Sequence, residues 1–256
     1  MTERRRFAVV AVVIVVLACA RAVHADQPLS PEQAWALAAS ALLTERNGER
    51  HDRLSGTSGN AGDGEDARRL LRDWWDVTDR RSLLESLEWI EKSGHRQGFE
   101  LAGQRLAALT PEKRQAFVAE RRSDPWFSQR MLVVQVHYAR LGAKSLVGWD
   151  FSRYISVCRW GYAAGYLTEP AAWARIIPAA RIIRHTFSSW REVGENYLIG
   201  RQYWSPEQHA QNGQLYREAL ERLLTDPASP WIRVPWDVDF GPPQQWRSRP
   251  APAPAN

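Results

Sequence analysis

The sequence is poor in the residues and motifs from which metal sites and disulfide-bonded folds are built. It has two cysteines, and the five histidines after residue 25 are scattered without a His-x-His or His-Glu-x-x-His spacing. Protein metal sites depend on such spacing, so we expect no metal ion and no cofactor. A Gly-x-Ser-x-Gly elbow is missing too, and an α/β-hydrolase nucleophile is therefore not supported.

Lysine is also scarce, and the positive charge comes almost entirely from arginine. Three Lys stand against 31 Arg, and the formal net charge of the whole chain is +5. Four of the arginines precede residue 26, and the rest of the chain carries 30 basic and 28 acidic side chains. A nucleic-acid interface needs Lys and Arg clustered on one face. This near-balanced, evenly spread charge argues against a nucleic-acid partner.

Residues 1–25 have the organisation of an export signal. Three arginines precede an apolar run over residues 7–20, and Val23-His24-Ala25 is suited to cleavage. A helix of that run would be roughly 21 Å long, short of the ~30 Å hydrocarbon core of a bilayer, which favours a cleaved signal. The alternatives are an uncleaved anchor, touching the membrane only through residues 7–20, and a lipoprotein modified at Cys19. All three place the domain outside the cytoplasm, in the periplasm or at the membrane.

Helix-start signals recur along the rest of the chain. Each places a side-chain oxygen at the N-cap and proline at the first helical position, where the missing N–H costs nothing. They are Ser30-Pro31, Thr110-Pro111, Asp124-Pro125 and Ser205-Pro206. Together with the 3.6-residue apolar periodicity between them, these signals predict an all-α, irregular multi-helix globular domain of about eight helices.

The predicted organisation places one main domain after the leader. An N-terminal helix occupies residues 26–46, and a glycine-rich flexible loop that no packed core could use spans 47–66. The helical domain runs over 67–240, and a Pro-rich tail over 241–256 is expected to be disordered.

The stretch from residue 149 to 165 predicts a helix that is apolar on two sides. One side carries Phe151, Ile155, Cys158, Tyr162 and Gly165, and the other carries Trp149, Arg153, Ser156, Trp160 and Ala163. Such a helix is typically central in its domain, so Arg153 should be at least partly buried. A buried cation needs a partner. Asp150, or cation-π contact with Trp149 or Trp160, is the expected one. Cys158, on the apolar side, should be inert packing.

A second seam follows between residues 188 and 204. Trp190, Val193, Tyr197, Gly200 and Trp204 recur at intervals of three and four residues. Glycine inside a helix costs about 1 kcal/mol relative to alanine, so Gly200 predicts close approach of another helix. We expect that helix to be the one carrying Gly161 and Gly165. The helix between these two, which starts at Glu169, should kink or split at Pro178.

Four short motifs in this region carry a family resemblance. They are Trp149-Asp150-Phe151-Ser152-Arg153, Arg159-Trp160-Gly161-Tyr162, Ser189-Trp190 and Tyr197-Leu198-Ile199-Gly200-Arg201. Together they resemble the signature of the bacterial domain-of-unknown-function family 1266 (DUF1266), most clearly over residues 130–210. The resemblance implies no reaction, substrate or cofactor.

The polar residues of the same region offer two interpretations. The candidate site residues are Asp150, Arg153, Arg159, Glu169, Glu195 and Arg201. If they pair internally, the chain is a non-enzymatic module of the bacterial envelope that binds another protein or has a structural role. Its candidate packing and interface residues are Trp149, Trp160, Trp190, Tyr197, Gly200 and Trp204. Alternatively, the arginines line a pocket for an anion, with Asp150 or Glu169 as acid or base, in an enzyme or small-anion-binding protein. An open pocket with unpaired arginines would favour the second interpretation.

Overall fold

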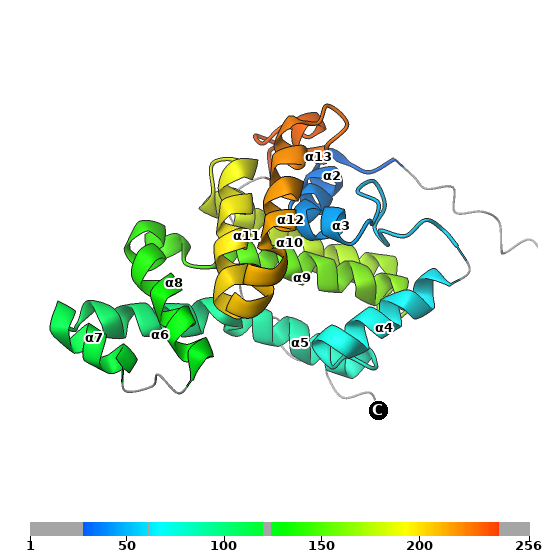
Figure 1. Cartoon of the computed structure of the whole chain (residues 1–256). Helices are drawn as coiled ribbons and strands as arrows, with labels where there is room; N and C mark the ends of the chain where they lie inside the picture. The colour runs from blue at the N-terminus through cyan, green and yellow to red at the C-terminus, as the bar shows by residue number, and fades with distance from the viewer. Residues whose placement is uncertain (1–27, 61, 120–123, 241–256) are drawn as a thin grey trace, which may run out of the picture.

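The computed structural model describes residues 28–60, 62–119 and 124–240 as a set of packed helices (Figure 1). No strand occurs within these ranges, which confirms the predicted all-α class. Short helices raise the number above the eight expected. The predicted export signal and the Pro-rich tail over 241–256 lie outside the described residues. None of the described helices is long and apolar enough to cross a bilayer.

The helix α9, Val147–Ala163, is the centre of the fold. Residues 148–161 are all buried, and helices on several sides pack against it. The neighbours are α3 (Ala41–Arg46), α4 (Asp63–Trp75), α5 (Arg80–Lys92), α6 (Gly94–Ala107), α10 (Glu169–Thr186) and α11 (Trp190–Trp204). The prediction of a central helix from its two apolar sides is therefore confirmed.

The remaining helices extend this core in two directions. α7 (Pro111–Ala119) and α8 (Pro125–Leu141) lie beside α6 to one side of the molecule (Figure 1). α2 (Pro31–Ala38), α12 (Pro206–Thr225) and α13 (Pro230–Arg233) cover the other end, and a 3-10 turn, Gly142–Lys144, leads into α9. α11 contacts both α8 and α12, so it links the two directions.

Local signals placed several helix ends correctly. Ser30 and Gln33 form the predicted capping box, and the side chains of Asp124 and Ser205 accept N–H bonds from the first turns of their helices. The single helix predicted over 26–46 is instead two, because the chain turns at residues 39–40 between α2 and α3. α10 runs through Pro178 as one helix without splitting, and it packs against α9 and α2.

The stretch predicted as a flexible loop over 47–66 differs most from expectation. α4 already begins at Asp63, and Leu54 is 7% exposed within the core. The preceding residues fold back on themselves, with Arg50 N donating to Gly56 O at 2.8 Å. The prediction that no packed core could use this stretch is wrong. A stretch with few apolar residues can still contribute to a core, because every residue carries a main-chain carbonyl that can accept a hydrogen bond.

A closed tryptophan cluster joins the two ends of the described chain. Its members are Trp35, Trp190, Trp231, Trp236 and Phe240, with ring centroids 4.6–5.8 Å apart. The indole nitrogens of Trp35, Trp190 and Trp231 each donate to a main-chain carbonyl, at 3.0, 3.1 and 2.8 Å. Buried indoles with paired N–H groups are what a structural core requires.

Candidate functional site

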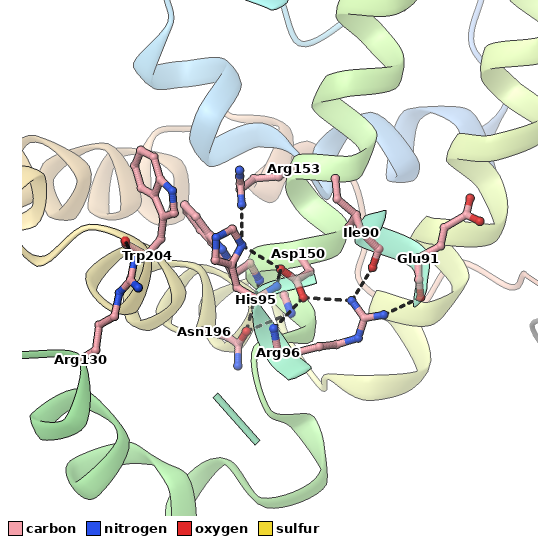
Figure 2. A network of polar contacts seen from close by, with 11 residues as sticks. Ile90, Glu91, His95, Arg96, Arg130, Asp150, Arg153, Asn196 and Trp204 are labelled. Carbon is pink, nitrogen blue, oxygen red and sulfur yellow. Dashed lines mark hydrogen bonds and ion pairs between the residues drawn. The ribbon is translucent and has the colours of Figure 1, made fainter. Parts of the chain in front are cut away.

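Asp150, one turn into α9, fixes the start of α6. Its carboxylate is buried and accepts the backbone N–H groups of His95 and Arg96 at 3.0 and 3.1 Å, together with the Arg96 guanidinium at 3.0 Å (Figure 2). Gly94 precedes them with φ of +57°, and a Cβ there would lie 2.2 Å from Asp150 Oδ2. Asp150 is thus a helix cap sealed by its own partners. The predicted pair with Arg153 is not formed.

Arg153, one turn further along α9, is stacked among tryptophans instead. Its guanidinium carbon lies 4.3 Å from the ring centroid of Trp149, as one prediction held, and 4.4 Å from that of Trp75. The predicted contact with Trp160 is replaced by one with Trp204 at 5.8 Å. These faces stabilise a cation without neutralising it.

The one hydrogen bond of Arg153 among the described residues joins its Nη1 to His95 Nδ1 at 3.1 Å (Figure 2). A guanidinium can only donate, so Nδ1 must be the acceptor and the imidazole neutral. Burial favours the same state, because it lowers the pKa of His95 against the opposing effect of Asp150. Burial also lowers the pKa of Arg153 to about 10, which leaves it charged at neutral pH.

Arg201, on α11, is a second buried cation near Tyr197. It is 2% exposed, and its guanidinium carbon lies 4.1 Å from the ring centroid of Tyr216. Nη2 donates to Gln208 O at 3.2 Å and to Asn212 Oδ1, whereas Nη1 is buried without a partner in the described part of the chain. No carboxylate in that part of the chain forms an ion pair with Arg201 or Arg153.

The two arginines line a common cavity of about 260 Å³, which we call the arginine-tryptophan pocket. Its other lining residues are Leu43, Asn47, Leu70, Trp74, Trp75, Trp149, Trp160, Tyr197, Trp204, Gln208, Asn212 and Tyr216. Trp149 Nε1 is a further buried donor that lacks a partner within the described ranges. The pocket thus combines aromatic walls with uncompensated positive charge and unused N–H donors.

The helices around the pocket are fixed at their ends by side chains. Asn196 of α11 accepts the N–H groups of Gly148 and Trp149 at 2.9 and 3.3 Å and so caps the start of α9. Arg130 of α8 donates to the carbonyls of Tyr203 and Trp204, at 3.0 and 2.8 Å, at the end of α11. These contacts hold the walls of the pocket without using its own polar groups.

Comparison with known proteins identifies the family. The family described as "Protein of unknown function (DUF1266)" matches residues 70–236. This chain belongs to the DUF1266 family. It is also similar to "Uncharacterized protein YbeR" of Escherichia coli (strain K12), with 28% identity over 160 residues. That alignment covers 61% of this chain and 65% of the relative, slightly less than two thirds of its length. No solved structure matches the chain.

The DUF1266 match includes most of the pocket. Twelve of the fourteen lining residues lie within it, and only Leu43 and Asn47, from the end of α3, precede it. The sequence pattern had drawn attention to Trp149, Arg153 and the aromatic residues of α11. It missed Trp74, Trp75, Asn212 and Tyr216, which come from α4 and α12 and carry no motif that ties them to α9.

Besides Asp150, three of the predicted site residues lie outside the pocket. Arg159 is fully buried and does not line the arginine-tryptophan pocket, and burial lowers its pKa. It donates to the carbonyls of Leu54, Arg50 and Arg53, at 3.2, 2.7 and 3.3 Å, and to the hydroxyls of Ser40 and Thr44. Glu169 is exposed at the start of α10, where it accepts from Trp173 Nε1 at 3.2 Å, and Glu195 is exposed on α11. Of the six predicted site residues, only Arg153 and Arg201 therefore line the pocket.

The predicted packing residues are divided in the same way. Trp149, Trp160, Tyr197 and Trp204 line the pocket, whereas Trp190 belongs to the closed tryptophan cluster. Gly200 does mark a close approach, since a Cβ there would lie 2.2 Å from Trp149 Cβ.

The expected partners of Gly200 were wrong. Gly161 faces Leu83, whose Cδ2 would lie 2.5 Å from an added Cβ, and Gly165 ends α9 with φ of +82°. The contact of α11 with α9 is therefore made at the opposite end of α9 from the one predicted.

The remaining chemistry considered from the sequence is not assembled into a site. Cys158 is buried, and burial raises the pKa of its thiol, which disfavours the nucleophilic thiolate. Within the ranges that the structure describes, no group of three or more His, Cys, Asp or Glu side chains could hold a metal ion.

Proposed function

We propose that this DUF1266 chain binds a small organic anion in the arginine-tryptophan pocket. One observation carries the proposal: Arg153 and Arg201 are buried cations that line a cavity and have no carboxylate partner among the described residues. A buried charge is costly unless it is paired. An anionic ligand would provide the missing charge and accept from the free Nη1 of Arg201.

The composition of the lining supports binding rather than acid-base catalysis. In addition to the arginines it consists of amide, aromatic and leucine side chains, with no Asp, Glu, His or Cys among the described lining residues. Those are the side chains that most often serve as general bases and nucleophiles. Asp150 and Glu169, the earlier candidates for such a role, lie outside the lining. One carboxylate does adjoin it, since Glu49 accepts from Asn47 and Trp160 at 3.0 and 2.8 Å.

The test is calorimetric titration of the full chain with small anions, using benzoate and inorganic phosphate as probes. Arg201→Gln should weaken binding at least about tenfold, because it removes a charge-assisted bond. Arg191→Gln is the matched control, since Arg191 lies on the same helix but is half exposed and pairs with Glu221 at the surface. Equal binding by wild type and both variants, or no binding by any of them, would refute the proposal.

A second candidate function, binding of another protein, is favoured by a different surface. Leu132 and Val136 of α8 are 55% and 68% exposed on one face of the helix and border a cavity of about 370 Å³. Exposed apolar side chains that adjoin a hollow are typical of a contact surface. A photo-crosslinker at position 136 should then give a discrete adduct that Leu132→Glu removes, while one at exposed Leu101 on α6 should not. Identical adducts from both positions would argue against an α8 interface.

We also propose export of the chain to the periplasm or its outer-facing membrane surface. The basic and apolar pattern of residues 1–25 supports this. Fractionation of cells that carry the intact chain or Cys19→Ser would separate cleavage, anchoring and lipidation. A full-length product in the cytoplasm would contradict export.

A further inference from the structure

We infer that the anion taken by the arginine-tryptophan pocket is a planar aromatic one, of the size of a substituted benzoate. This inference rests on the proposed function and narrows it. An inorganic anion or an aliphatic acid would also satisfy the arginines, so the choice depends on the rest of the lining.

An exposed indole borders the pocket. Trp74 lines the cavity and is 61% exposed, and it directly precedes Trp75, which is stacked on Arg153. No ring contact or hydrogen bond holds Trp74 within the described part of the chain. Water contact with a large apolar surface is unfavourable. A flat ligand that covers Trp74 would remove that contact, whereas a hydrated phosphate ion would not.

Aromatic rings form part of the lining of the pocket. Trp149 and Tyr197 meet edge to face at 4.9 Å, and Tyr197 stacks with Tyr216 at 6.3 Å with an angle of 19° between the rings. Ring faces and edges arranged in this way pair favourably with another ring. An aliphatic acid would gain burial at the same wall but none of this ring-to-ring preference.

Two N–H donors indicate where the acidic group of the ligand would lie. Trp149 Nε1 and Arg201 Nη1 are both buried donors without partners in the described residues, and both side chains line the cavity. Each can bond to a carboxylate oxygen, which is acceptor-only when ionised.

The size of the pocket limits the rest of the ligand. A volume of about 260 Å³ lies just below the range of about 300–1,000 Å³ typical of drug-sized ligands. One ring with an acidic substituent suits this volume better than a nucleotide or a peptide. The geometry therefore points to an aromatic acid with its ring toward Trp74 and its carboxylate toward Arg201 and Trp149.

The test is calorimetric titration of the full chain with four probes that separate charge from planarity. They are benzoate, cyclohexanecarboxylate, benzamide and inorganic phosphate. We expect benzoate to bind most tightly, with cyclohexanecarboxylate about two- to tenfold weaker, since it keeps the charge and loses the ring contacts. Benzamide, which keeps the ring and loses the charge, should be at least about tenfold weaker.

A variant at Trp74 adds a test that does not depend on folding, because replacement of this exposed indole should leave the fold intact. Trp74→Ala should weaken benzoate binding about two- to tenfold and leave cyclohexanecarboxylate binding closer to that of wild type. Trp126→Ala is the matched control, because Trp126 is 40% exposed on α8 and does not line the pocket. It should bind both acids as wild type does.

Two kinds of failure can be told apart. If cyclohexanecarboxylate or phosphate binds as tightly as benzoate, or Trp74→Ala changes nothing, the aromatic preference is wrong while anion binding stands. If no anion binds, or if Arg201→Gln binds benzoate as wild type does, the proposed function falls as well.

Discussion

The closed tryptophan cluster and the arginine-tryptophan pocket contain similar side chains, but the first is a structural core and the second is a candidate binding site. In the closed cluster the indole N–H groups of Trp35, Trp190 and Trp231 each reach a carbonyl. In the pocket, Trp149 Nε1 and Arg201 Nη1 are buried without acceptors in the described residues. Tryptophan content alone therefore does not tell a structural core from a candidate binding site. The pocket differs from the structural core by these two buried N–H donors that have no acceptor in the part of the chain that the structure describes.

Both regions are built on the same helix, which makes the comparison testable. α11 supplies Trp190 to the closed cluster at its first turn and Tyr197, Arg201 and Trp204 to the pocket further along. Substitutions at the two ends of α11 should therefore separate effects on stability from effects on binding.

The largest effect is expected at Trp190. Trp190→Ala would empty the centre of the closed cluster and leave Val234 O without its donor, so the free energy of unfolding should fall by about 3–5 kcal/mol. Urea denaturation followed by tryptophan fluorescence measures this loss. Trp74→Ala, at an exposed indole, should change stability by less than about 0.5 kcal/mol. Equal losses from the two substitutions would erase the distinction between the regions.

An intermediate effect is expected where the two helices touch. Gly200→Ala would place a Cβ 2.2 Å from Trp149 Cβ, and neither atom can move without its backbone. Overpacking of this kind costs about 1–3 kcal/mol. Because Trp149 lines the pocket, its displacement in this variant should also weaken benzoate binding. Gly62→Ala serves as a control for an added methyl group, since no atom lies within 4 Å of its Cβ position and alanine readily adopts its φ of −89°. Unchanged stability and binding in Gly200→Ala would show that α11 is not held against α9 as described.

The periodicity of the sequence predicted the central helix but not what surrounds it. Apolar residues on two sides of one helix require neighbours on two sides, and this placed Arg153 in the interior correctly. Periodicity holds no information on which distant helix supplies each neighbour. Trp75, His95 and Tyr216 come from three other helices, so the contacts of Arg153 and Arg201 could not be derived from spacing. Asp150 was assigned to Arg153 because i and i+3 are adjacent on a helix, yet the N-terminus of α6 offered it better donors.

A smaller effect should appear on acidification. Burial lowers the pKa of His95 below its value of about 6.5 in the unfolded chain, so the folded state favours the neutral ring. The stability contributed by this group is then complete above pH 6.5 and is lost as the pH falls below it toward the folded pKa. Protonation would also place a positive charge on His95, next to the charged guanidinium of Arg153.

Comparison of wild type with His95→Gln isolates this contribution, because His51, His137 and His209 also have lowered pKa values and remain in both proteins. The measurement is the midpoint of urea unfolding between pH 5 and 8. The variant should lose less stability on acidification. Parallel curves for the two proteins would mean that His95 is not neutral in the fold.

A small effect on stability is expected at Arg201. Arg201→Gln removes a buried cation that lacks a counter-charge in the described residues, so relief of desolvation should offset the lost bonds to Gln208 and Asn212. We expect a change within about 1 kcal/mol of either sign, by the same denaturation measurement. A loss comparable with that of Trp190→Ala would make Arg201 a structural residue and weaken the case for a ligand.

Arg159 has a consequence for where this domain begins. The family match starts at residue 70, but among the described residues every hydrogen-bond acceptor of this buried guanidinium lies between Ser40 and Leu54. A chain that began at residue 70 would leave the Arg159 guanidinium, in the middle of α9, without these hydrogen-bond acceptors. We therefore expect the cooperative folding unit to include the N-terminal segment that lies upstream of the family match.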